Sequence, residues 1–355
     1  MSKIKFCARV ALLLALSCML FGCGTTNSAG KNQKMPDWVT GPSDSYPKTA
    51  YVTGTGNAVD KRAAELDAIS ELVAVFGQKI TAASLASRRM EHAQAAGVVA
   101  TATASSLDQS VLREVSQDDI IAVEIPEFFE SKQEGKWYAL AVMNKETAAN
   151  MYISMIQKNE TEINAILNQY RADKDPNTLL NYARLDFAEE VARTNEKYLK
   201  RLVILNSEAA KQFESIATPV QIHKIRMEMA AKIPICVNVD DDSDGRIAKS
   251  FQEVMASAGF NTTIGSNERY VIQCFVHLND GKSTDGKTQF CEYVVEAGLN
   301  DTFMGETLIP LSLTGREGAP STEAAQSRAK QKISAKVKTE FADRFQKYLG
   351  DFTAF

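Results

Sequence analysis

Four aspartates and a glycine lie close together between residues 240 and 245. The order of Asp240, Asp242, Asp244 and Gly245 fits the first half of a calcium-binding loop, in which alternate carboxylates converge on the cation. The twelfth position of such a loop carries a bidentate glutamate, and here it is Phe251. The alternative is that Asp244 caps the following helix while the other acids interact favourably with the helix dipole. The residues therefore predict either a calcium site or a helix start.

Glycine and histidine patterns elsewhere do not complete a catalytic motif. Gly54 and Gly56 lie between an apolar run and a helical pattern, where phosphates can bind, but Val59 stands where a dinucleotide fingerprint has its third glycine. A tight turn is the expected role of these glycines. The histidines have no second histidine at ligand spacing and no nucleophile motif, so we expect them on the surface; they are His92, His223 and His277. The sequence predicts that this protein is not an enzyme and has no cofactor other than the calcium considered above.

The first residues of the chain carry an export signal. Lys3, Lys5 and Arg9 precede an apolar run, residues 10–21, which ends in a lipobox at Cys23. A basic start, a short apolar stretch and a small residue before the cleavage point are typical of a secretory signal peptide. The run is shorter than the ~20 apolar residues that a membrane-spanning helix needs. We expect a bacterial lipoprotein whose residues 1–22 are removed and whose Cys23 is acylated; an ordinary signal peptide with a chance cysteine is the alternative.

Three cysteines remain in the chain beyond the lipobox. Since three is an odd number, at most one disulfide can form among them within the chain. Cys274 and Cys291 fall on the inward faces of two predicted strands that a loop joins, where the register could place them opposite each other. An exported protein permits such a disulfide. A Cys274–Cys291 bridge and buried free thiols are both open, whereas Cys236 is expected to stay reduced in a buried strand.

Charge and composition exclude one class of partner. The chain has 355 residues, with 45% apolar and 24% charged residues, as in ordinary globular proteins. Its formal charge is -4, and removing a signal peptide with three cations and no anions leaves about -7. Nucleic-acid binding requires a basic surface, so no nucleic-acid partner is expected.

Three segments with different patterns follow a polar tether at residues 23–35. Residues 36–147 combine a strand pattern, a helix and a hairpin. The helix stripe has small residues first and large ones later, which predicts a close crossing over a sheet at one end; it consists of Ala64, Ala68, Leu72, Phe76 and Ile80. Residues 148–231 are helical throughout, with helix starts predicted at Asp175-Pro176 and Thr218-Pro219. We expect a helical hairpin that packs on itself or on a partner.

Residues 232–355 change to a β-α-β-β-β-α order. The first strand is a continuous apolar run, and the helix after it ends at Gly259. Pro310 lies inside the last strand and predicts an edge position. Ser321 is placed to cap a final helix whose apolar residues recur every four positions. The expected fold class is α+β, with two small sheet-and-helix modules joined by a helical hairpin.

The N-terminal segment resembles the Lpp-twenty family of small, membrane-associated bacterial lipoproteins. The resemblance covers roughly residues 36–151, under a third of the chain, and its matching residues are Pro36-Asp37-Trp38-Val39, Tyr51-Val52-Thr53-Gly54-Thr55-Gly56-Asn57-Ala58 and Trp137-Tyr138-Ala139-Leu140-Ala141. The same segment is similar to the N-terminal domain of flagellar assembly protein T, a periplasmic ring component. The resemblance implies a non-enzymatic protein at the outer membrane and transfers no catalytic residues.

The C-terminal segment is similar to the N-terminal domain of Tol translocation protein B in the order of its elements alone. Such domains also occur in lipoproteins that contact periplasmic partners, and element order by itself does not establish a function.

Together these observations predict a component of the bacterial cell envelope, attached to a membrane through acyl chains on Cys23 and contacting other envelope proteins. Gly24 is not an acidic retention signal, so the outer membrane is expected, with the chain facing the periplasm or the cell surface. Two alternatives remain: a ligand- or calcium-binding envelope module that uses the 240–245 loop, and a periplasmic activator of a cell-wall enzyme.

Overall fold

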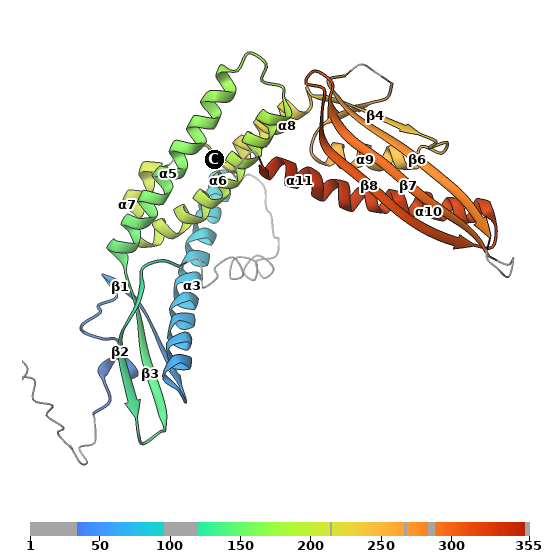
Figure 1. Ribbon diagram of the computed structural model, residues 1–355. Coiled ribbons are helices and arrows are strands. Elements are labelled where there is room, and N and C mark those ends of the chain that lie inside the picture. The colour runs from blue at the N-terminus through green and yellow to red at the C-terminus, as the bar shows by residue number, and fades with distance from the viewer. Residues whose placement is uncertain (1–33, 96–119, 214, 266–267, 283–287, 352–355) are drawn as a thin grey trace, which may run out of the picture.

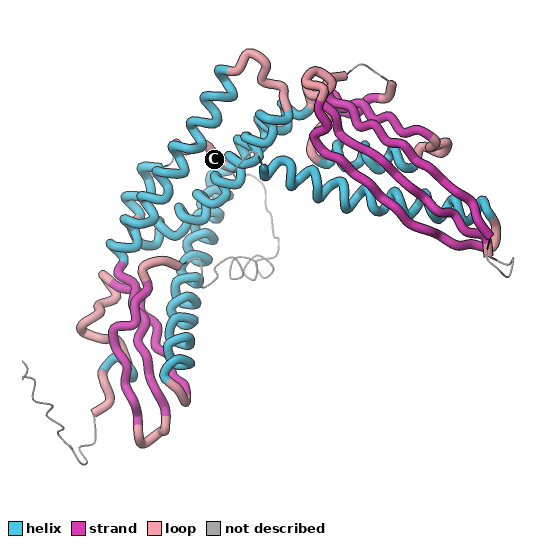
Figure 2. The backbone as a smooth tube through the Cα atoms, in the orientation of Figure 1, coloured by secondary structure: helices cyan, strands magenta, loops and turns pink. Residues whose placement is uncertain are grey.

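The computed structural model describes residues 34–95, 120–213, 215–265, 268–282 and 288–351. The fold is α+β, as the sequence predicts, with one three-stranded and one five-stranded sheet. The two sheets lie at opposite ends of an elongated, bent molecule, and long helices connect them (Figures 1 and 2). Cys23 and the predicted signal peptide lie outside the described residues.

The N-terminal sheet is antiparallel, in the order β1-β3-β2. Its strands are β1 (Tyr51–Ala58), β2 (Val123–Ser131) and β3 (Lys136–Asn144). Helix α3 (Lys61–Ala95) covers one face, and the predicted apolar stripe from Ala64 to Ile80 is buried there. The short helix α2 (Asp37–Thr40) packs Trp38 against the other face, beside Phe129 and Leu140.

Two glycines of β1 lie directly beneath α3. A Cβ atom on Gly54 would be 2.3 Å from the Leu72 nitrogen, and one on Gly56 would be 2.1 Å from the Ala68 nitrogen. The predicted tight turn at these glycines is wrong, because both lie inside the strand. Their missing side chains, together with the small residues Ala64 and Ala68, allow the helix to approach the sheet backbone. The predicted close crossing is therefore confirmed.

Three long helical segments form the middle of the chain. They are α5 (Lys145–Ala172), α6 (Leu179–Leu205) and α8 (Pro219–Ala230), with α7 (Ser207–Ala210) and a 3-10 turn (Lys211–Phe213) between the last two. The helix start predicted at Thr218-Pro219 is confirmed, since Thr218 forms a capping box. Asn144 caps α5, where its side chain accepts from the Thr147 amide. The start predicted at Asp175-Pro176 is wrong by a few residues: Thr178 caps α6 by accepting from the Asn181 amide.

Helices α5 and α6 pack side by side as an antiparallel pair, each about 40 Å long at ~1.5 Å per residue. Their apolar contact is interrupted by Asn159, whose side-chain amide donates to the Asn195 side chain at 2.9 Å. Asn195 is buried, so this pair favours one register of the two helices.

Each end of the helical pair belongs to a different hydrophobic core. Tyr152 of α5 is buried with the N-terminal sheet and α3, and Tyr198 of α6 packs against the same cluster. At the other end, Leu179 and Tyr182 of α6 are buried with the C-terminal sheet. The helices therefore act as a rigid spacer whose two ends are fixed by side-chain packing.

The C-terminal sheet has the order β5-β4-β6-β7-β8. Its strands are β4 (Pro234–Asp240), β5 (Asn261–Thr263), β6 (Tyr270–Lys282), β7 (Gln289–Asp301) and β8 (Glu306–Ala319). The helices α9 (Arg246–Ser257), α10 (Thr322–Lys336) and α11 (Ala342–Asp351) lie on one face (Figure 1). The sequence did not predict the short β5, but it correctly placed Pro310 on an edge strand and Ser321 at a helix start.

The last helical segment contains a π-helical turn that keeps one apolar stripe facing the sheet. Its buried residues recur every four positions; they are Ala325, Ala329, Ile333, Val337, Phe341, Phe345 and Leu349. In a regular α-helix of 3.6 residues per turn, such a stripe rotates by about 40° at each step. A π-helical turn at Val337–Phe341 joins α10 to α11. Because a π turn contains more residues than an α turn, it reduces the rotation and keeps the stripe on the sheet.

Candidate functional site

The acidic loop starts a helix. The Asp242 carboxylate accepts from the amides of Ile247 and Ala248 at 2.9 and 2.8 Å, which satisfies two free N–H groups at the start of α9. Asp244 instead lies within 3.5 Å of Arg246 and 3.6 Å of Lys330. The expected capping residue was Asp244, and the structure shows that it is Asp242.

Calcium binding by this loop stays a prediction, and the described side chains are not grouped as a metal site. Among the residues that the structure describes, no three His, Cys, Asp or Glu side chains are grouped in a way that could hold a metal ion, and Asp240, Asp242 and Asp244 are all described. Burial raises the pKa of Asp242, and the neighbouring Asp244 raises it further because the two carboxyls interact. Asp242 therefore caps α9, and Asp244 interacts with the two cations beside it.

Of the two alternatives for Cys274 and Cys291, the structure supports buried free thiols. Cys236, Cys274 and Cys291 are all buried and unbridged. The strand register places Cys274 opposite Ala297 and Cys291 opposite Asp280. The two cysteines are thus offset by six residues along the strands, about 20 Å at ~3.4 Å per residue, so a Cys274–Cys291 disulfide is incompatible with this register. Burial raises the pKa of the Cys274 thiol to about 12.

One histidine takes part in a charge network that the sequence did not predict. Glu189 of α6 has a side chain only 3% exposed. It accepts from Arg226 of α8 at 3.0 Å, from Arg193, and lies 3.1 Å from the ring of His223. Burial alone would raise the pKa of Glu189, but hydrogen bonds from Arg193, His223 and Arg226 hold it below its ordinary value. Glu189 is therefore a buried anion with its partners in place.

The same network connects the helices to the C-terminal module. Arg226 donates to the Tyr182 hydroxyl at 2.6 Å, and this hydroxyl donates to the carbonyl of Ala258 at the end of α9. Tyr182 also packs its ring against Phe260, with centroids 4.7 Å apart. The buried polar side-chain atoms of this network all have hydrogen-bond partners, so we assign the network to structure rather than to chemistry. His277 is exposed on the open sheet face, as predicted, and the side chain of His92 lies outside the described residues.

A second charged contact holds the turn between β7 and β8. Arg269, just before β6, donates to both carboxylate oxygens of Asp301, with its Nη2 at 2.9 Å from one of them. Asp301 is buried and also accepts from the backbone amides of Phe303 and Met304 at 3.0 and 3.2 Å. Burial would raise the pKa of Asp301, but these hydrogen bonds, above all that from Arg269, hold it below its ordinary value. The turn conformation is therefore fixed by one ionised side chain.

This rigid turn presents two large apolar side chains to solvent. Phe303 is 75% exposed and Met304 is 66% exposed. The Arg269 guanidinium lies 5.4 Å from the Phe303 ring centroid, within cation–π range. We call residues 302–305 the apolar tip. Exposed aromatic and methionine side chains are enriched at protein–protein contacts.

A hollow lies next to the apolar tip, where the C-terminal sheet meets the start of α6. Its volume is about 300 Å³. Arg269 reaches across it to Asp175 of the α5–α6 loop, at 3.2 Å, and the Tyr270 hydroxyl accepts from the Leu179 amide. The walls also include Tyr348 of α11. The hollow therefore separates the tip from the helical spacer and has acidic, basic and aromatic walls.

Comparison with known proteins gives no family for this chain. No protein-family model matches the sequence, and no curated protein matches it. The resemblances to the Lpp-twenty family, flagellar assembly protein T and Tol translocation protein B therefore remain expectations from the sequence.

Some solved structures are similar in part. A secreted protein from the human pathogen Helicobacter pylori has a TM-score of 0.41 and 15% identity, covering 82% of this chain and 97% of that chain. A minor lipoprotein from Acinetobacter baumannii has a TM-score of 0.21 and 15% identity, over 34% of this chain and 91% of that chain. The rare lipoprotein B from Shewanella oneidensis has a TM-score of 0.22 and 15% identity, over 34% and 96%. At such low similarity, function has to be argued from this chain's own residues.

Within the described residues, no helix has both the length and the apolar character needed to cross a bilayer. Cys23, the predicted site of membrane attachment, lies outside those residues.

Proposed function

We propose that this chain is a non-enzymatic lipoprotein of the bacterial cell envelope. It is held at the outer membrane through acyl chains on Cys23 and acts by binding another envelope protein with the apolar tip. The lipobox at Cys23 supports the attachment, since two or more acyl chains anchor a protein stably. The apolar tip carries the proposal of contact.

The backbone of the apolar tip is fixed by hydrogen bonds to Asp301. Exposed apolar side chains cost solubility, and a mobile pair would lose conformational entropy on binding. The backbone amides of Phe303 and Met304 are held beforehand by the Asp301 carboxylate, so a partner does not have to order the backbone of the turn. A turn that fixes two exposed apolar residues in this way is suited to insertion into an apolar pocket of another protein.

The charges around the tip favour a protein partner over an anionic lipid surface. Glu306 follows the tip and is exposed, and the Asp175 side chain beside Arg269 is 70% exposed. These acids would be repelled by anionic headgroups and would be attracted to a basic rim around a pocket. The partner is therefore a protein with an apolar pocket and basic residues at its margin.

The spacer separates attachment from contact. The tether leads into the N-terminal module, which packs against the Leu205 end of α6. The tip lies near the Leu179 end of α6, and the length of this helix, about 40 Å at ~1.5 Å per residue, separates the two. This separation supports a contact site that lies away from the membrane surface proposed for Cys23.

The experiment combines cell fractionation with site-specific photocrosslinking. Cys23→Ala should move the chain from the membrane fraction to the soluble fraction. A photoreactive residue at position 303 should give a discrete protein adduct in cells, and Met304→Ser in the same chain should reduce its yield. A photoreactive residue at Val220, which is 77% exposed on α8, is the matched control and should not give that adduct.

Continued membrane attachment of Cys23→Ala would refute the anchor. Equal adducts from positions 303 and 220, or adducts with lipid alone at 303, would refute the contact role of the tip.

A further inference from the structure

The strand β8 has one unpaired edge along its whole length. It is 14 residues long, lies last in the sheet, and pairs only with β7. In an antiparallel pair, alternate residues direct both their N–H and their C=O groups away from the neighbouring strand. Long free edges of this kind pair readily with other extended chains unless something covers them.

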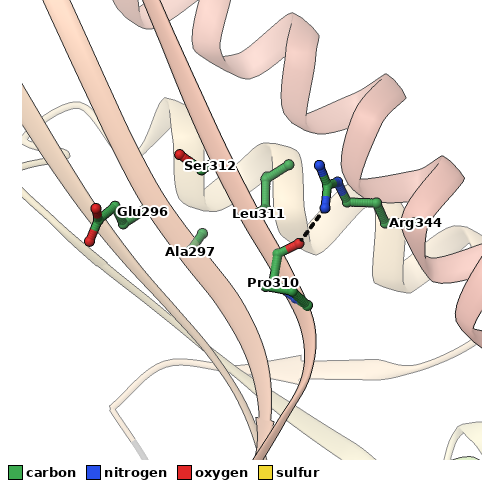
Figure 3. Close-up of a pocket in the computed structure, with 6 residues that line it drawn as sticks. All are labelled: Glu296, Ala297, Pro310, Leu311, Ser312 and Arg344. Carbon is green, nitrogen blue, oxygen red and sulfur yellow. Dashed lines mark hydrogen bonds between the residues drawn. The ribbon is translucent and has the colours of Figure 1, made fainter.

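Three cations of the covering helix reach this edge at regular intervals. Arg344 donates to the Pro310 carbonyl at 2.9 Å, Lys336 to the Thr314 carbonyl at 3.2 Å, and Arg328 to the Gly318 carbonyl at 2.5 Å. Figure 3 shows the first of these bonds.

The spacing of the three contacts is matched on both elements. The cations are eight residues apart on the helix, about 12 Å, and the carbonyls four residues apart on the strand, about 13 Å. Helix and strand run in opposite directions, so the three bonds form one row along the edge, which we call the basic row.

The free edge of β8 therefore offers more hydrogen-bond donors than acceptors. Alternate outward carbonyls are already bound by cations, whereas the outward N–H groups of residues such as Ser312 and Arg316 are donors. The i, i+4 positions of the helix from Arg328 to Arg344 hold four cations and one anion, Glu340, in a chain whose formal charge is -4. An edge that offers mainly donors and positive charge is complementary to an extended segment rich in carboxylates.

A second copy of this chain fits the edge poorly. Pairing two β8 edges would bring two basic rows against each other, and like charges placed opposite one another are destabilising. Pro310 also lacks the N–H group that a continuous ladder requires. Pro310 removes one ladder bond for any added strand, whereas the basic row discriminates between strands: it rejects a second copy and attracts an acidic segment.

We propose that the edge of β8 binds an extended acidic segment of a partner protein by strand addition. Arg328, Lys336 and Arg344 turn from the strand carbonyls to the carboxylates of the segment, and the freed carbonyls accept from its backbone N–H groups. This inference goes beyond the proposed function, because it concerns a different surface from the apolar tip and does not depend on membrane attachment.

A hollow at one end of the edge supplies a place for a side chain of the segment. Its volume is about 320 Å³, and it lies between Arg344 and Glu296 around Pro310 and Ser312 (Figure 3). A residue next to the carboxylate held by Arg344 would enter this hollow. The segment should therefore alternate acidic and apolar residues, with period two.

The test uses the mature chain carrying Cys23→Ala and two fluorescent ten-residue peptides, one alternating Glu and Val and the other alternating Lys and Val. Fluorescence anisotropy should show at least about tenfold tighter binding of the Glu peptide at low salt, as expected when three exposed charge pairs contribute. The preference should fall as salt is raised. Hydrogen exchange at the amides of residues 312–318 should slow when the Glu peptide is bound.

The variant R328Q/K336Q/R344Q should lose about tenfold in affinity for the Glu peptide. The control K249Q/K282Q/K347Q removes the same charge from exposed lysines elsewhere in the module and should stay within about twofold of the parent chain. If the triple variant does not fold, the comparison of the two peptides on the parent chain still decides.

Equal affinity for the two peptides, or unchanged amide exchange at β8, would overturn the proposal. So would a triple variant that self-associates while binding the Glu peptide as the parent chain does, because the basic row would then only prevent pairing with a second copy. Neither result bears on the fractionation and crosslinking experiments at Cys23 and Phe303.

Discussion

Replacing Gly56 by alanine should selectively destabilise the N-terminal module. The added Cβ would lie 2.1 Å from the Ala68 nitrogen and 2.4 Å from the Ala64 carbonyl oxygen. Both atoms belong to the backbone of α3, so no side-chain rotation can relieve the contact. The helix would have to move outward by more than about 1 Å to restore normal contact distances. Overpacking in a core costs about 1–3 kcal/mol, and we expect the upper end of that range or more because a whole helix moves.

The two tryptophans of the chain make this prediction measurable. Trp38 and Trp137 both lie in the N-terminal module, so tryptophan fluorescence during denaturation reports on that module alone. For a module of this size, 3 kcal/mol corresponds to a loss of more than about 10 °C in Tm. Gly281→Ala is the matched control, since Gly281 is also a strand glycine and a Cβ there would meet nothing within 4 Å. Equal fluorescence midpoints for the two variants would refute the close-packing argument.

Three further predictions concern buried charges and thiols. Glu189→Gln should be less stable than the parent at pH 7 by about 1–3 kcal/mol. Because the pKa of Glu189 is lowered in the folded state, the parent's advantage should decrease as pH falls below about 4.3 and vanish below the folded-state pKa. A constant difference in chemical denaturation down to acid pH would contradict this. Asp242→Ala should lower the free energy of unfolding by about 1–2 kcal/mol because it removes the cap of α9, and Asp240→Ala should lower it less. Millimolar calcium should not raise the parent's Tm. A calcium-dependent rise in a thermal melt would instead support calcium binding by the loop. The three buried thiols should resist iodoacetamide in the folded chain and should all react in urea without a reductant; they are Cys236, Cys274 and Cys291. Mass spectrometry counts the modified cysteines. Thiols that react only after reduction would contradict the free-thiol assignment.

Local signals in the sequence were sufficient for much of the fold. The caps at Asn144, Thr218 and Ser321 depend on a side chain and an amide three residues later, so the sequence contains both partners. The fourfold apolar stripes likewise predicted which helix faces are buried. The start of α6 was misplaced because Asp173 organises the loop before it, accepting from the Asp175 amide and from the Asn181 side chain, and leaves the capping role to Thr178.

The contacts that define the candidate sites had no such local signal. Glu189 and Arg226 are 37 residues apart, and Arg269 and Asp301 are 32 residues apart. Their pairing depends on how helices and strands are packed, which periodicity does not specify. The register of β6 and β7 could not be predicted from the sequence either. The position of the turn decides whether Cys274 lies opposite Cys291 or opposite Ala297. The closeness of Gly54 and Gly56 to α3 could have been inferred, because small residues occur in both partners.

The continuous core between α6, α8 and the C-terminal sheet limits how the chain can be divided. A fragment that begins at residue 232 would lack Leu179, Tyr182, Ile222 and Met229, all of which are buried against that sheet. Its exposed interior would be a large apolar surface, prone to aggregation. The smallest fragment that keeps this core intact has to include the helical pair, so recombinant work on the C-terminal part should start at residue 145 or before.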